Sequence, residues 1–247
     1  MAGLRRSLSL YPDFLPSVPE VGRFGYRVGM APTIRPDLAA AHERAWTSLT
    51  SAGTWFSARE RRALTRVAIA AMWSGSAEPV DTGADVSDEA AAAASRLASG
   101  SPHVTREWYE SVRDAIGPLA FVELVGLVAV ASAAASFRRT LGLVEIELPD
   151  VESSGAADDG PSRIDPPELA DAKWNWVPVA APADKTAAVV QALTAVPATF
   201  DELWSLADAQ YIPDAEMVDP KWTRGTLTRV DMELIATRVS FSRECHY

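Results

Sequence analysis

The chain has 247 residues, a formal net charge of −10, a pI near 4.8 and 48% apolar residues. This length allows one large domain or two small ones, and the apolar fraction is enough to bury a core. The acidic balance excludes nonspecific binding to nucleic acid or to an anionic membrane, because both need a basic face. No uninterrupted apolar run reaches the roughly 18 residues of a membrane span, so no membrane partner is expected. One cysteine indicates a reducing, cytoplasmic compartment.

Residues 1–36 are rich in proline and glycine, which predicts an extended arm. Residues 37–148 are predicted to form a first helical module, because apolar side chains recur along one helix face. The expected helices are 37–51, 58–73, 88–97, 106–116 and 119–141. Ser57 and Glu60 form a capping box ahead of the second of these, and Thr105 caps the fourth. The fifth is apolar nearly all round, which predicts a buried central helix.

Residues 149–182 are acidic and rich in proline, which predicts a solvated linker that Trp174 and Trp176 attach to the body. Residues 183–247 are expected to form an incomplete second module. Its helices are predicted at 185–193, at 200–208 and after Thr228. Thr228 and Asp231 repeat the capping-box pattern seen at Ser57. The fold class is therefore expected to be all-α, with two degenerate repeats.

The C-terminal sequence contains a glutamate, Glu233, twelve positions before the single cysteine, Cys245. This spacing resembles the first half of the E-x11-C-x2-C-x3-H signature of the carboxymuconolactone decarboxylase and alkylhydroperoxidase D family. The second cysteine and the histidine would fall at positions 248 and 252, after the last residue given. The order and spacing of four further blocks are also similar to two-repeat members of the family. These blocks are 97–109, 121–126, 137–143 and 207–217.

The resemblance implies an all-α homo-oligomer with thiol peroxidase or oxidoreductase activity. Its partners would be a peroxide substrate and a thiol reductant, with no cofactor or metal. It assigns Cys245 as the nucleophile and Glu233 to a proton relay that generates the thiolate. Because the second cysteine and the histidine are missing, the chain as given is expected to be weakly active or inactive. A non-catalytic helical scaffold, or pseudoenzyme, that binds a protein partner is the alternative.

The two capping boxes align the repeats so that Cys245 lies opposite Ser74, or opposite Met72 if the register differs by two residues. Neither register gives the first module a cysteine or histidine, so this module is expected to be redox-silent. The end at residue 247 has three open explanations: a truncated gene, a cloned fragment, or a UGA codon at 248 read as selenocysteine.

Several other side chains have simpler expected roles. Cys245 could be a bystander near a frayed terminus, and His246 could be a spacer or could lower the thiol pKa. His42 is expected to be solvated and His103 structural. The Arg61–Arg62 and Arg138–Arg139 pairs are expected on solvated helix faces, with oxyanion binding as the alternative.

Overall fold

The computed structural model describes seven ranges of the chain: 33–75, 86–100, 104–143, 147–148, 160–171, 173–183 and 187–242. All described helices belong to one compact unit, Ile34–Tyr247. The described residues form eight α-helices and two short pairs of β-strands, so the predicted all-α class is confirmed. The arm predicted at residues 1–36 lies almost entirely outside these ranges.

The helices of the first predicted module begin and end within a few residues of the expected positions. They are α1 (Pro36–Ser48), α2 (Ala58–Ser74), α3 (Asp88–Ala98), α4 (Arg106–Ile116) and α5 (Pro118–Thr140). Local capping explains this agreement at α2 and α4. The Ser57 hydroxyl accepts from the Glu60 amide while the Glu60 carboxylate accepts from the Ser57 amide, as predicted. Thr105 likewise caps α4 through the Trp108 amide.

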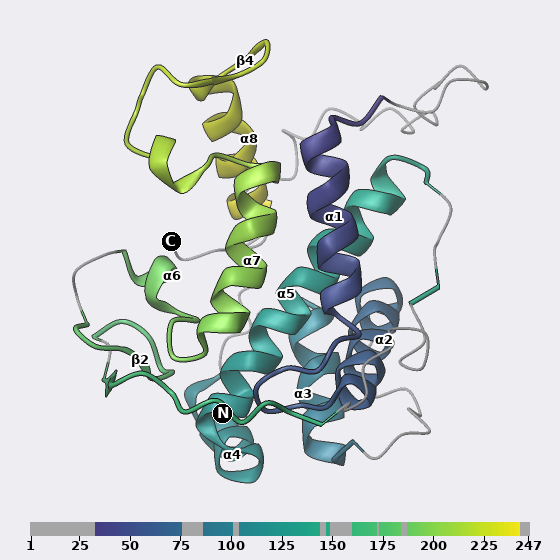
Figure 1. Cartoon of the computed structure of the whole chain (residues 1–247), viewed down its shortest axis with the longest axis vertical. Helices are drawn as coiled ribbons and strands as arrows, with labels where there is room; N and C mark the ends of the chain where they lie inside the picture. Colours follow the sequence, from purple (N-terminus) through teal and green to yellow (C-terminus); the bar gives the residue numbers. More distant parts are fainter. Residues whose placement is uncertain are drawn as a thin grey trace, which may run out of the picture. The chain divides into compact units, whose positions relative to one another are not determined.

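Helix α5 is the centre of the packing and contacts α1, α2, α3, α4 and α7 (Figure 1). Its side chains Leu124, Leu127 and Val130 are completely buried in the main apolar cluster. By length and hydropathy α5 could cross a membrane, but 61% of its most apolar window is buried. Burial of this kind is what the central helix of a packed domain shows.

The later helices are α6 (Ala188–Gln191), α7 (Pro197–Gln210) and α8 (Arg229–Ser242). The prediction of a longer helix at 185–193 is wrong, because the chain turns after Gln191. The Thr194 hydroxyl donates to the Gln191 carbonyl and accepts from the Ala180 amide, which ties this turn to a neighbouring strand. Side-chain hydrogen bonds of this type compete with helix continuation.

Helix α7 comes very close to α5 at Gly126. A Cβ atom placed at Gly126 would overlap the Thr199 side-chain methyl group and come within contact distance of Leu193. Only the absence of a side chain permits this approach. The interface is continued by Val122, Leu193 and Val196, which form a second apolar cluster. Thus α7, from the predicted second module, packs directly on the central helix of the first.

The described residues between 160 and 182, within the expected linker, are tied to the helical body. The amides of Ser162 and Arg163 donate to the carbonyls of Gly53 and Thr54. Strand β1 (Leu169–Ala170) then pairs antiparallel with β2 (Val179–Ala180). Trp176 contacts Tyr109 at a ring-centroid distance of 6.1 Å, as its expected anchoring role requires. Trp174 does not anchor the segment in this way, because it is 71% exposed.

Replacing Ser57 with alanine should lower the free energy of unfolding by about 1 kcal/mol, because α2 loses the side-chain acceptor for its N-terminal amides. Urea denaturation followed by circular dichroism measures this change. Ser111→Ala is the matched control, since Ser111 is exposed inside α4 and caps nothing. Equal stability of the two variants would contradict the capping role.

Candidate functional site

Glu233 lies in the second turn of α8, whose start is defined by a short hairpin. Strand β3 (Thr223–Arg224) pairs with β4 (Leu227–Thr228), and Gly225 has a φ of 61° in the turn between them. Thr228 and Asp231 then cap the helix as predicted. The Thr228 amide donates to the Asp231 carboxylate at 3.0 Å, and the Asp231 amide donates to the Thr228 hydroxyl at 3.2 Å.

The Glu233 carboxylate has two partners that the sequence did not indicate. Arg229, one turn earlier on α8, donates to it at 2.7 Å. The Tyr211 hydroxyl also donates to it, and this bond together with Arg229 holds the pKa of Glu233 below its usual value. Burial, followed by the adjacent Glu233 carboxylate, raises the pKa of Tyr211 to about 12. Glu233 is therefore ionised and Tyr211 protonated throughout the neutral range.

Arg224 on the hairpin fixes the position of Tyr211. Its guanidinium donates to the Tyr211 carbonyl at 2.6 and 2.8 Å and to the Asp208 carbonyl at 2.7 Å. These bonds connect the C-terminal end of α7 to the hairpin that leads into α8. The backbone at Tyr211 is therefore fixed by Arg224, and the Tyr211 hydroxyl donates to Glu233 from this position.

Cys245, the predicted nucleophile, lies outside the described residues, as do His246 and His103. Ser74, its counterpart in one repeat register, is the last residue of α2. Met72, its counterpart in the other, accepts a weak hydrogen bond from the Ser136 hydroxyl at 3.8 Å. The structure therefore brings Glu233 together with Tyr211 and Arg229. The Cys245 thiol is not among the described residues.

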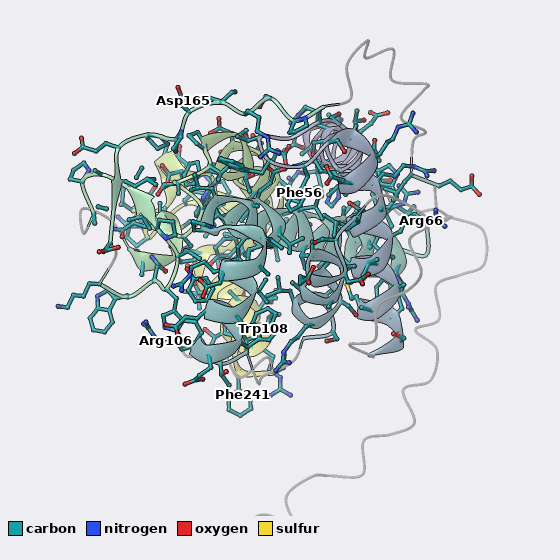
Figure 2. All side chains as sticks on the ribbon, turned by 90° about the horizontal axis from the view of Figure 1, so that it is seen from below. Phe56, Arg66, Arg106, Trp108, Asp165 and Phe241 are labelled. Carbon is teal, nitrogen blue, oxygen red and sulfur yellow. The ribbon has the colours of Figure 1, made fainter. Side chains whose placement is uncertain are left out.

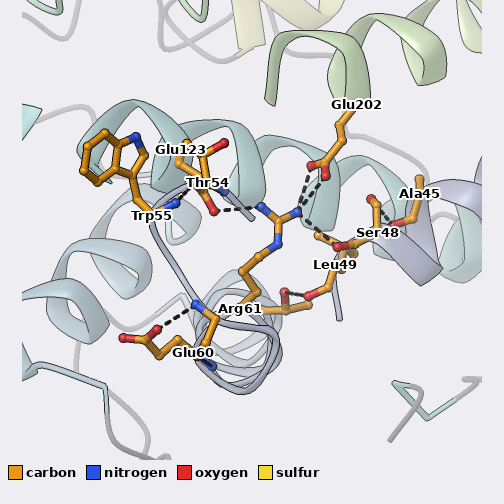
Figure 3. Close-up of polar contacts among 11 residues, drawn as sticks. Ala45, Ser48, Leu49, Thr54, Trp55, Glu60, Arg61, Glu123 and Glu202 are labelled. Carbon is orange, nitrogen blue, oxygen red and sulfur yellow. Dashed lines mark hydrogen bonds and ion pairs between the residues drawn. The ribbon is translucent and has the colours of Figure 1, made fainter. Parts of the chain in front are cut away.

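A second polar cluster, absent from the sequence predictions, is buried between α2, α5 and α7 (Figure 3). Arg61 is 1% exposed, so the expectation that it lies on a solvated helix face is wrong. Its guanidinium donates to Glu123 at 3.0 Å, to Glu202 at 2.8 Å and to the Ser48 carbonyl at 3.0 Å. A buried charge must be paired in this way, since water no longer solvates it.

Glu123 is completely buried, and both of its oxygens accept hydrogen bonds. One accepts from Arg61, and the other accepts from the amides of Thr54 and Trp55 at 3.0 and 2.7 Å. Gly53 lies against this carboxylate, and a Cβ atom at Gly53 would overlap its Oε1. The sequence did contain a signal, because Glu123 is the only charged residue between Pro118 and Phe137 of an otherwise apolar helix.

The charges of this cluster favour a structural role. Burial alone would lower the pKa of Arg61, but Glu202 and Glu123 together raise it above its usual value. Burial raises the pKa of Glu202 and outweighs the attraction of Arg61, whose charge is shared with Glu123. Glu202 also lines a small cavity of about 240 Å³ beside Arg44 and Asp201. Arg61 stays charged at all working pH values and acts as the link between three helices.

His42 also differs from its expected position. It was expected on a solvated face, but it is 7% exposed and stacks on Phe137 at a centroid distance of 3.7 Å. Burial, with a smaller contribution from Arg138, lowers its pKa to about 4. The ring is therefore neutral at pH 7 and serves as a flat packing surface between α1 and α5.

No protein-family model, curated protein or solved structure matches this chain. Within the described ranges, no group of three or more His, Cys, Asp or Glu side chains could hold a metal ion. The candidate sites therefore rest on the geometry of the residues themselves.

Replacing Glu123 with glutamine should lower the free energy of unfolding by about 3 kcal/mol at pH 7, because a buried amide N–H₂ would face N–H donors. Glu202→Gln is the matched control and should cost less, since Glu202 is 23% exposed.

The raised pKa of Glu202 makes its stabilising contribution decline as pH rises above about 4.5. The gap between wild type and Glu202→Gln should therefore narrow between pH 4.5 and 7 in urea titrations. Equal costs at Glu123 and Glu202 would contradict this account.

Proposed function

We propose that the protein is an alkylhydroperoxidase-like thiol peroxidase in which Cys245 is the nucleophile and Glu233 belongs to its proton relay. The observation that carries the proposal is the setting of Glu233. This carboxylate, twelve residues before the single cysteine, is held by Tyr211 and Arg229 at the start of a capped helix. These two partners hold the carboxylate in one orientation, which supports a positioned role for it.

The reaction is a two-electron reduction of the peroxide. The Cys245 thiolate attacks the terminal peroxide oxygen, the O–O bond breaks, and the leaving alkoxide takes a proton to become an alcohol. The cysteine is oxidised to a sulfenic acid. An external thiol then attacks this sulfur and releases water, and a second thiol equivalent restores the cysteine. Peroxide and thiol reductant are the two partners, and a reducing cytoplasm is the matching compartment.

The charges around Glu233 define what it does in this scheme. Its pKa is lowered, so it is a weak base for a free thiol and a strong hydrogen-bond acceptor. Arg229 offsets part of its negative charge, which reduces the repulsion that a bare carboxylate would impose on a nearby thiolate. Tyr211 keeps its proton at neutral pH and, like Arg229, donates to Glu233. The relay therefore consists of Tyr211 and Glu233 with Arg229 as the counter-charge.

The geometry of α8 sets one requirement. Glu233 precedes Ser242, the last residue of α8, by nine positions, or about 14 Å along the helix axis. A straight helical continuation would place Cys245 still farther away. The relay therefore requires the chain after Ser242 to turn back toward Tyr211, or to reach Glu233 of a second copy.

Iodoacetamide should alkylate Cys245 with a midpoint well below the value of about 8.5 for a free thiol, because the site stabilises the thiolate. Cumene hydroperoxide should then give a sulfenic acid that dimedone traps, as detected by mass spectrometry. Glu233→Gln should slow this trapping by about 100-fold. Glu43→Gln, an exposed change on α1, is the control. A wild-type midpoint near 8.5, with no effect of Glu233→Gln, would reject the enzymatic proposal.

A non-catalytic scaffold is the second candidate function, and the surface of α8 favours it. Val230, Leu234, Ile235, Val239 and Phe241 are each more than half exposed. Figure 2 shows the Phe241 ring pointing outward from this helix. Apolar side chains concentrated on one exposed helix are typical of an interaction surface. The homo-oligomer that the family resemblance implies would cover it with a second copy of the chain.

Replacing both Leu234 and Phe241 with lysine should convert an oligomer into monomers, because buried charges would oppose association. Size-exclusion chromatography with light scattering measures the mass directly. Val218→Lys is the control, since Val218 is 89% exposed outside α8. A monomeric wild type at micromolar concentration would rule out the second copy as the occupant of this surface.

A further inference from the structure

A pocket of about 260 Å³ opens between α1, α2 and α5, away from Tyr211 and Glu233. Its wall comes from Trp46 of α1, from four residues of α2, from three residues of α5 and from Leu148. The α2 residues are Arg66, Ile69, Ala70 and Trp73, and the α5 residues are Ala135, Arg138 and Arg139. Figure 2 labels Arg66, which lies at the exposed rim. Nothing in the peroxidase chemistry uses this pocket.

The charged side chains that line the pocket are cationic. Among the described residues, three arginines and no acidic residue line it, although the chain as a whole carries a net charge of −10. Within the described part of the chain, Arg66 and Arg139 form no ion pair. The C-terminal end of α5 accounts for positive charge at Arg138 and Arg139, since cations stabilise that end of a helix. It does not account for Arg66, which lies in the middle of α2.

Two tryptophans hold two of the arginines in place. The Arg139 guanidinium lies 4.1 Å from the ring centroid of Trp73, and that of Arg138 lies 5.9 Å from Trp46. A guanidinium stacked on an indole keeps its N–H edge available and loses less freedom when it binds an anion. Trp46 is itself fixed, because its indole N–H donates to the Glu147 carbonyl at 3.3 Å. Arg138 and Arg139 are therefore preorganised.

The remaining wall is apolar and comes from Ile69, Ala70, Ala135 and Leu148. An inorganic anion would gain nothing from it, whereas a flat apolar ring would bury surface against it and against the indoles. A carboxylate on that ring would reach the arginines at the rim and accept paired N–H bonds. The volume suits a ligand of one or two rings. We propose that this pocket binds an aromatic carboxylate, independently of the function proposed for Cys245 and Glu233.

Calorimetric titration of the full chain with 2-naphthoate tests the proposal, and 2-naphthamide serves as the neutral probe of the same shape. Naphthoate should bind at least tenfold more tightly than the amide. Arg66→Gln and Arg139→Gln should each weaken naphthoate binding several-fold and leave amide binding unchanged. Arg139→Lys should restore part of the loss, because it keeps the charge. Arg106→Gln is the matched control, since Arg106 stacks on Trp176 at 5.5 Å outside the pocket.

Three results would overturn the proposal. The first is equal affinity for naphthoate and naphthamide, which would remove the role of the arginines. The second is a loss in Arg106→Gln as large as that in Arg66→Gln, which would indicate nonspecific attraction. The third is inorganic phosphate competing as well as naphthoate does, which would remove the role of the ring. Arg66 and Arg139 are exposed, so the variants should keep the helical circular dichroism of the wild type.

Discussion

The buried guanidinium of Arg61 is the constraint on which the rest of this fold depends. It forms ion pairs with Glu123 of α5 and Glu202 of α7. Water cannot replace these partners, because the Arg61 side chain is only 1% exposed. The same carboxylate of Glu123 organises the turn before α2 through two backbone amides. A buried ion pair adds little net stability compared with apolar residues, but breaking one is costly. The cluster therefore ties α2, α5 and α7 to one another at one buried point.

The accuracy of the sequence predictions follows the range of the interactions involved. Helix limits in the first half were predictable because their signals are local, such as Glu60 three residues after Ser57 and the Trp108 amide three residues after Thr105. Arg61 was mistaken for a surface residue because its partners lie 62 and 141 residues away in the sequence. His42 was misplaced for the same reason, since Phe137 supplies the surface that buries it. Helical periodicity identifies which face is apolar, but it does not reveal a charge that is neutralised from another helix.

In the candidate sites, too, local relations could be predicted from the sequence and long-range contacts could not. The spacing between Glu233 and Cys245 was readable from the chain, and Arg229 could have been expected from its position one turn before Glu233. Tyr211 could not, because it reaches Glu233 only through the hairpin that Arg224 clamps to the end of α7. The aromatic and cationic pocket likewise combines residues of three helices, although the Arg138–Arg139 pair had been considered for oxyanion binding. Residues that act together from separate helices carry no joint signature in one sequence.

The ion pair between Arg61 and Glu202 also bears on how the chain folds. It joins residues on opposite sides of the acidic, proline-rich stretch, and Gly126 lets α7 sit directly against α5. The helices before and after this stretch therefore share one core and do not form two separate domains. A protease cut between residues 148 and 160 would leave two fragments that remain associated and unfold in a single transition. The fragment before the cut would keep Arg61 paired with Glu123 but lose Glu202, and the fragment after it would carry Glu202 without its guanidinium partner.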